Sequence, residues 1–182
     1  TVEPLYLGSM AWRNPQTQRK TTMLVIGQDP EHIILNLPEV NRQLPKLQLP
    51  NTVLFDQKSR GSYQKMIEEI QAGQTVTTEM GTNTITVVGL FSVGASFADD
   101  GALITSTDTF LRLFPKRTAG TVSLGLVHLQ PGADLQRVQT QLAAYLPDDV
   151  QVFTYPEYVN FEMDYLRTRS PIGFVFGLGT VM

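Results

Sequence analysis

The first part of the chain contains two strand-like runs, residues 5–12 and 21–27. Residues 13–20 between them include Asn14 and Pro15, a pair that is typical of turns. The pattern therefore predicts a β-hairpin with a long tip. Three basic residues gather at this tip: Arg13, Arg19 and Lys20. We interpret the cluster as a solvated loop in preference to a binding site, because short charge clusters are usually solvated.

The central part of the chain alternates strand and helix patterns. Residues 28–51 hold four prolines and leave room for only a short helix near residues 39–44. Residues 81–83, Gly-Thr-Asn, tolerate positive φ angles, so the strands on either side of them should form a second hairpin. The strands expected in this region are residues 52–56, 75–80, 84–91 and 101–105.

Two longer helices are expected in the same region. The first carries apolar residues at helical spacing on one face and ends at Gly73. Its apolar face consists of Tyr63, Met66, Ile67 and Ile70. The second spans residues 106–114, because a Ser, Thr or Asp at its start can cap it and Pro115 ends it.

The last third of the chain predicts a βαβ unit followed by a further helix. Residues 121–129 and 150–154 have strand patterns, and residues 134–146 between them have a helical pattern. The helical segment carries one apolar stripe: Leu135, Val138, Leu142 and Leu146. A second helix begins near Pro156 and leads into residues 171–182. Its stripe consists of Tyr158, Phe161, Tyr165 and Leu166.

Residues 171–182 form an uncharged, apolar run, PIGFVFGLGTVM. A membrane helix needs ~20 apolar residues, so this run is too short to span by itself. It fits either a buried C-terminal helix or the start of a transmembrane helix. Its three glycines favour the second interpretation, because glycine is costly in soluble helices and common in membrane helices. Arg167, Arg169 and Pro171 would then mark the membrane junction, with both arginines at the headgroups.

Composition narrows the functional classes. Hydrophobic residues make up 42% of the 182 residues and charged residues 17%, which predicts a folded globular chain. A net charge of -3 without a basic, aromatic-rich patch argues against nucleic acid as a partner. The chain has no cysteine, which excludes disulfides, thiolate nucleophiles and sulfur-bound metals. No signal-peptide pattern follows Thr1.

A search for catalytic and metal-binding motifs leads to the expectation that the chain is not an enzyme. It has neither a Gly-Lys pair for a phosphate-binding loop nor a Gly-x-Ser-x-Gly nucleophile elbow. We expect His32 to be exposed and His128 to be a structural residue on the apolar face of its strand. The pair Asp99-Asp100 is typical of a turn, because a calcium loop needs alternating oxygen ligands. No two helix carboxylates stand out as an acid–base pair. We therefore predict no catalytic, cofactor or metal site.

Six segments carry a resemblance to one family, and their order is kept along the whole chain. They are TTMLVIGQDP (21–30), NLPEVN (36–41), LPNTVLFDQKSR (49–60), ITVVGLF (85–91), VHLQPGADLQRVQTQL (127–142) and FEMDYLRTRSPIGFVFGLGTVM (161–182). Over these segments the chain resembles the extracytoplasmic domain of MacB-type ABC-transporter permeases, in particular their DevC branch.

This resemblance implies an α+β fold, the two-lobed periplasmic core domain of MacB-like permeases. Residues 1–8 and 121–165 would form a porter-like lobe that contains the βαβ unit and lacks its N-terminal part. Residues 9–120 would form an inserted β-rich lobe. Residues 166–182 would form the start of a transmembrane helix.

The resemblance also implies a function and a set of partners. The domain would dock a membrane-fusion adaptor protein and transmit ATP-driven motion, so that cargo is exported through an outer-membrane channel reached by the adaptor. The cargo associated with the DevC branch is glycolipid. The ATPase would be a separate subunit, and the permease would be a homodimer. The protein would lie in the inner (plasma) membrane, with this domain in the periplasm.

Two other functions stay open at this point. The chain could be a module that binds a lipid-like substrate, in a transporter or in a lipoprotein-release permease. An apolar groove between its lobes would favour that function. It could also be a soluble enzyme, for which the sign would be a pocket with convergent polar groups of perturbed pKa.

Overall fold

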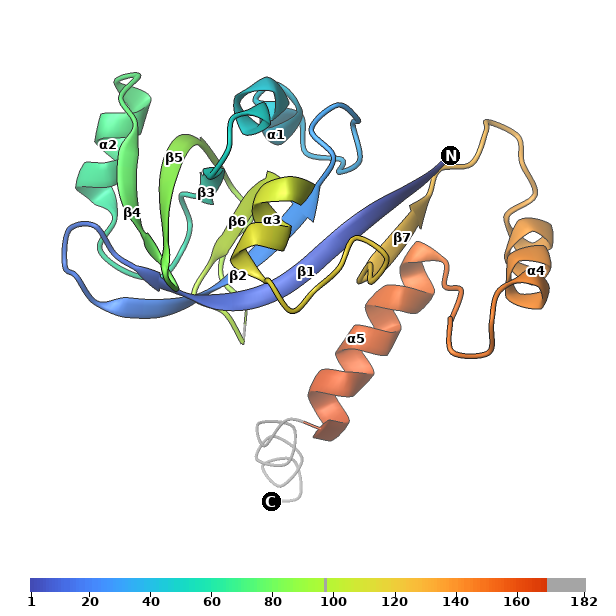
Figure 1. Ribbon diagram of the computed structural model, residues 1–182. Helices are drawn as coiled ribbons and strands as arrows, with labels where there is room; N and C mark the ends of the chain where they lie inside the picture. The colour runs from blue at the N-terminus through green and yellow to red at the C-terminus, as the bar shows by residue number, and fades with distance from the viewer. Residues whose placement is uncertain (97, 170–182) are drawn as a thin grey trace, which may run out of the picture. The chain divides into compact units, whose positions relative to one another are not determined.

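The computed structural model describes residues 1–96 and 98–169 and has a mixed α+β fold (Figure 1). In chain order its elements are β1 (Val2–Arg13), β2 (Lys20–Gln28), α1 (Pro38–Asn41), the 3-10 helix η1 (Leu44–Gln48), β3 (Thr52–Asp56), α2 (Gln64–Gln71), β4 (Val76–Met80), β5 (Asn83–Phe91), β6 (Ala102–Ser106), α3 (Thr107–Leu113), β7 (Leu124–Val127), α4 (Leu135–Tyr145) and α5 (Tyr155–Arg169).

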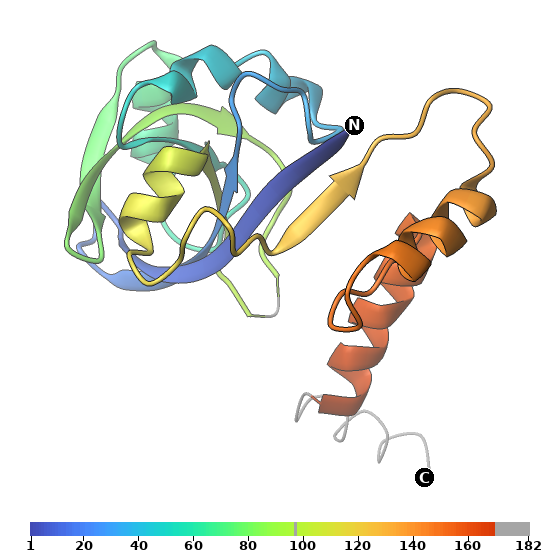
Figure 2. The same ribbon diagram turned by 45° about the vertical axis from the view of Figure 1, so that its right-hand side comes forward.

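Six of these strands close into a barrel in the order β1, β2, β6, β3, β5, β4 (Figure 2). The pairs β2–β6 and β3–β5 are parallel, and the other neighbours in the barrel are antiparallel. Strand β4 closes onto β1 through one residue pair, Trp12 opposite Met80. Because the sheet closes on itself, most of its hydrogen-bonding edges are paired.

The barrel has apolar side chains inside and a second apolar layer on one outer face. Trp12 and Phe55 are fully buried inside, with their ring centroids 5.5 Å apart. On the outer face, Val40 of α1 and Leu47 of η1 pack in one cluster with Ile104 of β6. Every residue of β3 and β6 is buried, because these two strands lie between both layers.

Helices α2 and α3 complete the inner core with Met66 and Phe110. Helix α3 approaches β2 closely at Gly27, where a Cβ atom would lie 2.6 Å from the Cβ atom of Phe110. Only glycine fits at this contact. Of the three candidate capping residues, Ser106 is the one that caps α3, since its hydroxyl accepts a hydrogen bond from the N–H of Thr109 at 3.2 Å.

Most of the expected elements in the first 128 residues are confirmed. Strands β1 and β2 pair in register from Tyr6 opposite Gly27 to Arg13 opposite Lys20, so the first hairpin and its tip are as predicted. The second hairpin is β4–β5. The sequence pattern missed η1, which begins at Leu44 in the proline-rich segment.

The expected βαβ unit is wrong in its last strand. Strand β7 and helix α4 lie where they were predicted, but residues 150–154 form no strand. A strand exists only beside a hydrogen-bonded neighbour, and this segment pairs with no strand of the described chain. Strand β7 pairs instead with the N-terminal part of β1, with Val2 opposite Val127 and Leu5 opposite Leu124.

The chain divides into two compact units, Thr1–His128 and Leu129–Met182. In the second unit the side-chain amide of Gln139 on α4 donates to the carbonyl of Val152 at 3.2 Å and to Glu157 on α5 at 2.7 Å. The rings of Phe153 and Phe161 lie 5.2 Å apart. Among the helices that the structure describes, none is both long and apolar enough to cross a membrane.

Candidate functional site

The expected membrane junction lies at the C-terminal end of the described chain. Arg167 and Arg169 belong to the last turn of α5, which extends as one helix from Tyr155 to Arg169. Pro171, and the run expected to continue into a membrane, lie outside the described residues. The helix up to Arg169 is therefore confirmed, and the junction itself stays a prediction.

The two histidines differ in how well they were predicted. His32 is exposed as expected, and its Nδ1 lies 3.3 Å from a carboxylate oxygen of Glu3 and 3.4 Å from one of Asp29. The expectation of a structural His128 is wrong, because its side chain is exposed just beyond the end of β7. Within residues 1–96 and 98–169, no group of histidines and carboxylates could hold a metal ion.

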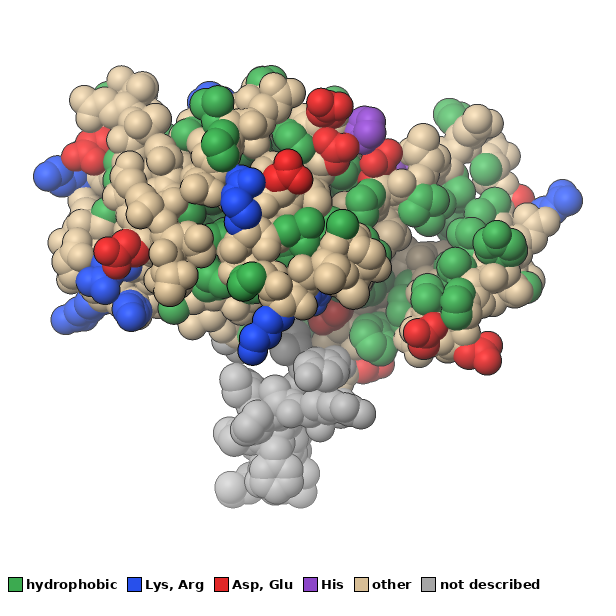
Figure 3. Space-filling model, in the orientation of Figure 1, with side chains coloured by type: hydrophobic (Ala, Val, Ile, Leu, Met, Phe, Trp, Pro, Cys, Tyr) green, Lys and Arg blue, Asp and Glu red, His purple; other side chains and the backbone are tan. Residues whose placement is uncertain are grey.

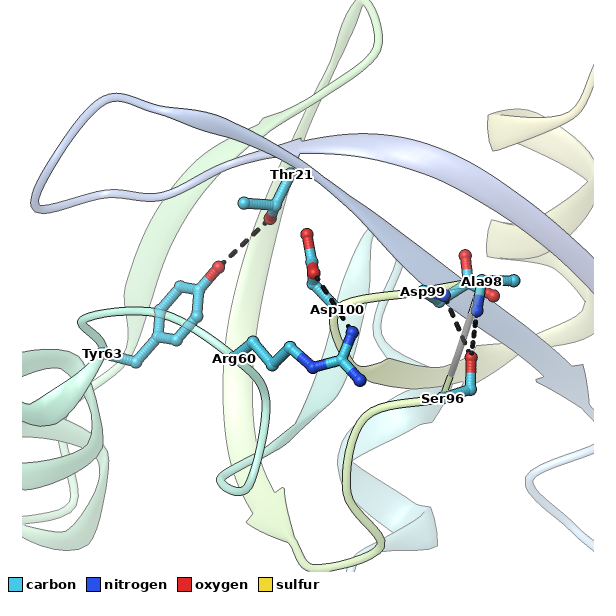
Figure 4. A network of polar contacts seen from close by, with 7 residues as sticks. All are labelled: Thr21, Arg60, Tyr63, Ser96, Ala98, Asp99 and Asp100. Atoms are coloured by element: carbon cyan, nitrogen blue, oxygen red, sulfur yellow. Dashed lines mark hydrogen bonds and ion pairs between the residues drawn. The ribbon is translucent and has the colours of Figure 1, made fainter. Parts of the chain in front are cut away.

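The acidic pair Asp99-Asp100 lies in the loop between β5 and β6, where it has structural contacts (Figure 4). The hydroxyl of Ser96 accepts the N–H of Asp99 at 3.0 Å. The carboxylate of Asp100 lies 3.8 Å from Arg60, and its backbone N–H donates to Thr22 on β2. These contacts attach the loop to the first hairpin, which agrees with the expected turn.

A basic tip lies at the far end of the β1–β2 hairpin. We define it as Arg13, Arg19 and Lys20. The Nε of Arg13 lies 2.8 Å from a carboxylate oxygen of Glu79 on β4. Arg19 and Lys20 are exposed, and neither has a carboxylate within ion-pair distance in the described part of the chain.

A buried asparagine holds the tip in one conformation. Asn14 is 3% exposed, and its side-chain oxygen accepts the backbone N–H groups of Gln16 and Thr17 at 2.8 and 3.1 Å. Its side-chain nitrogen donates to the carbonyl of Ser62, just before α2. The tip thus presents its cations from a fixed turn, and a basic tip of this kind can bind an anionic surface.

An acidic groove of about 740 Å³ opens where the parallel strands β2 and β6 end. Its walls carry three carboxylates, Asp29, Glu31 and Asp108, against one guanidinium, Arg112. Arg112 is held against the protein, since its Nη2 donates to the hydroxyl of Thr109 at 2.9 Å. Sequence reasoning missed this groove, because its walls come from distant segments and no local motif marks them.

Apolar side chains are exposed throughout the second unit. No residue between 129 and 164 is buried, and α4 has no buried position at all. Tyr145 and Tyr155 are 86% and 82% exposed. The other large apolar residues exposed here are Leu129, Leu135, Val150, Phe153, Val159, Phe161 and Met163. Exposed apolar surface at this density is typical of an interaction surface.

Neither a protein-family model nor a curated protein matches this chain.

Proposed function

We propose that this chain is the periplasmic domain of a MacB-type ABC-exporter permease, of the DevC branch, and that it acts by docking and motion without chemistry of its own. The proposal rests on the resemblance of six ordered segments and on the contrast between the two units. The first unit is a closed, well-packed barrel. The second unit exposes its apolar residues and leads through α5 towards the apolar run at residues 171–182.

The exposed apolar surface of residues 129–164 is the observation that supports the proposal most directly. A free-standing soluble domain hides such side chains in a core, whereas a domain of a larger assembly leaves them for its partners. In the proposed permease this surface is covered by the other parts of the transporter or by the adaptor protein. The separate ATPase subunit acts on the opposite side of the membrane, and the adaptor leads to the outer-membrane channel.

The chain offers a continuous path for motion in such a transporter. A displacement of the membrane segment would act first on α5. The second unit is linked covalently at residues 128 and 129 to the end of β7, and β7 is hydrogen-bonded to β1. Since β1 continues through the barrel to the basic tip, a pull on β7 reaches the whole hairpin.

The lipid-binding alternative gains no support from the groove. Its walls carry charged side chains, whereas a site for an acyl chain is lined mainly by apolar and aromatic residues. No observation on residues 1–96 and 98–169 favours the enzyme alternative either.

Topology and protection of single cysteines test the proposal. The chain has no cysteine, so Tyr145→Cys and Lys116→Cys each add one thiol to a cysteine-free full-length permease, produced with its ATPase subunit and adaptor. A membrane-impermeant maleimide should label both variants in spheroplasts and neither in sealed inside-out vesicles. Assembly with the adaptor should slow labelling of the apolar-surface variant more than that of the barrel variant. Labelling from the cytoplasmic side only would refute the proposal.

A further inference from the structure

The first unit has opposite charges at the two ends of its long hairpin. Figure 3 shows several Lys and Arg side chains at one end of the barrel, with some Asp and Glu side chains among them, and a group of Asp and Glu side chains beside a histidine near the other end. The basic end is the tip defined above, and the acidic end is the groove beyond β2. The hairpin register from Tyr6 to Arg13 separates them, so they cannot neutralise each other within one molecule.

Two carboxylates of the groove are available to bind a cation. Glu31 and Asp108 are exposed, and neither lies within ion-pair distance of a basic group in the described residues. The carboxylate of Asp29 already has partners within its own loop, because it accepts the N–H of Glu31 at 2.9 Å and lies 3.4 Å from Nδ1 of His32. Glu31 and Asp108 are therefore the carboxylates available to an incoming group.

A buried amide without a hydrogen-bond partner among the described residues lies on the same face of the sheet as the groove but does not line it. Gln28 is fully buried at the end of β2, and neither polar atom of its side chain has a hydrogen-bond partner in the described structure. Its register partner on β6 is Ser106, which lines the groove. Paired residues of neighbouring strands point to the same face, so the amide lies on the groove side of the sheet.

We infer that the basic tip of one copy of this chain docks into the acidic groove of a second copy. The tip is a protruding, fixed turn whose free cations are Arg19 and Lys20, and the groove is a concave site whose free carboxylates are Glu31 and Asp108. The two are complementary in charge. This head-to-tail contact goes beyond the proposed transport function and does not depend on it.

The contact is heterologous, because the two surfaces that meet are different. Each copy that docks its tip leaves its own groove free for a third copy, so the association is open-ended unless it closes into a ring. It is also sensitive to salt, since its charges lie at exposed positions. The Debye length is about 30 Å at 0.01 M salt and about 3 Å at 1 M. Association should therefore be strong at low salt and absent at high salt.

Sedimentation equilibrium of the 182-residue chain provides the test. At about 10 mM salt the average mass should rise above the 20.3 kDa of the monomer as concentration increases, and at about 1 M salt the part of this rise that comes from the tip and the groove should disappear. Reversal of the tip by Arg19→Glu with Lys20→Glu should raise the dissociation constant at least about ten-fold. Reversal of the groove by Glu31→Lys with Asp108→Lys should do the same.

The four changes combined should restore association, because an acidic tip then meets a basic groove. A matched control, Lys116→Glu with Arg137→Glu, alters the net charge as much as the tip variant but touches neither surface, so it should still associate. Circular dichroism verifies that each variant is folded. If the double variant of the tip or of the groove does not fold, the single change Lys20→Glu or Glu31→Lys is used in its place. A monomeric parent chain at low salt, or a folded four-fold variant that stays monomeric, would overturn the inference.

Discussion

The buried carboxylate of Asp56 accepts a hydrogen bond from the backbone N–H of Gly94 at 2.6 Å. Its other oxygen accepts the N–H groups of Val93 at 3.1 Å and Lys58 at 3.0 Å. One side chain at the end of β3 thus holds both the loop that follows it and the loop that leads from β5 to β6. These loops lie in one barrel but are distant in sequence.

Replacement of Asp56 by Asn should destabilise the first unit by roughly 2–3 kcal/mol. In the variant, the side-chain NH₂ group would face a backbone N–H group that donates to a carboxylate oxygen in the parent chain, so that N–H group would lose its acceptor. The remaining hydrogen bonds would also weaken, because hydrogen bonds to a charged group are stronger than those to a neutral one. Chemical denaturation of the two chains measures the difference. Asp148→Asn, at an exposed position, is the control and should have almost no effect. A loss below about 0.5 kcal/mol for Asp56→Asn would contradict this role.

Tyr63 should make the barrel lose stability at alkaline pH. Its side chain is 2% exposed, and its hydroxyl lies 3.2 Å from that of Thr21 (Figure 4). Burial raises the pKa of Tyr63 above its ordinary value of 10.0, while the hydrogen bond to Thr21 acts in the opposite direction. The neutral phenol is therefore favoured in the folded chain. The contribution of the neutral phenol to the free energy of unfolding is fully present below pH 10 and is lost as the pH rises through the raised pKa.

Replacement of Tyr63 by Phe should accordingly have two effects. At neutral pH the lost hydrogen bond should cost about 1 kcal/mol of unfolding free energy. Above pH 10 the variant should lose stability less steeply than the parent chain, because one group that titrates on unfolding is gone. Urea denaturation at a series of pH values measures both. Tyr145→Phe, at an exposed site, should leave the pH dependence unchanged, and equal slopes for all three chains would rule out the effect.

Sequence patterns predicted the parts of the fold that depend on neighbouring residues. The first hairpin could be recognised from Asn14 and Pro15, and α3 from the capping residue Ser106. The closure of the barrel could not be recognised, because it depends on pairs such as Trp12 with Met80, which are far apart in the chain. Residues 150–154 show the opposite error. Their composition suits a strand, but composition does not supply a neighbouring strand.

The candidate surfaces were predicted to a smaller extent. The basic tip is continuous in sequence, so its residues were found, although they were interpreted as a solvated loop. The groove combines Asp29 with Asp108, and nothing in the sequence relates these two residues. His128 was assigned to the interior because it alternates with apolar residues. Alternation identifies a face of a strand, but it does not tell whether another layer covers that face.

Glu157 should make the start of α5 sensitive to acid. Its carboxylate accepts the backbone N–H of Thr154 at 2.7 Å, while the hydroxyl of Thr154 accepts the N–H of Glu157 at 3.4 Å, so the two residues form a capping box. The hydrogen bonds from Thr154, and then that from Gln139, lower the pKa of Glu157 below 4.5. The ionised carboxylate of Glu157 therefore stabilises the start of α5 above pH 4.5, and this stabilisation is lost as the pH falls through the lowered pKa.

Hydrogen exchange of the Thr154 amide measures this effect by NMR. Protection should be seen at neutral pH and should fall as the solution is acidified below pH 4.5. Glu157→Ala should remove the protection at every pH, whereas Glu157→Gln should keep part of it without the pH dependence, because a glutamine can also accept the bond. Asp149→Ala, outside the helix, is the control. Unchanged protection in the alanine variant would show that the capping box does not form.

The last prediction concerns α5 as a rigid connection in the proposed permease. The helix is continuous from Tyr155 to Arg169, so a displacement at its C-terminal end should reach its N-terminal end and the rest of the second unit. Two glycines inserted between Thr168 and Arg169 should interrupt this connection, because each glycine costs about 1 kcal/mol relative to alanine in a helix. In the intact transporter the insertion should uncouple export from ATP hydrolysis and leave adaptor binding to the isolated domain nearly unchanged.

Two further insertions distinguish the loss of stiffness in α5 from the added chain length and from a general disturbance of the fold. Two alanines at the same place lengthen the chain equally but keep it helical, so export should be retained better than with two glycines. Two glycines after Gly73, in the turn between α2 and β4, lie outside the proposed path from α5 through β7 to β1 and should reduce export least. Export and ATP hydrolysis are measured in the same reconstituted vesicles, so that uncoupling appears as hydrolysis without transport. Normal export by the glycine variant at Thr168 would eliminate the rigid-helix mechanism, and export lost equally in all three variants would assign the defect to chain length instead.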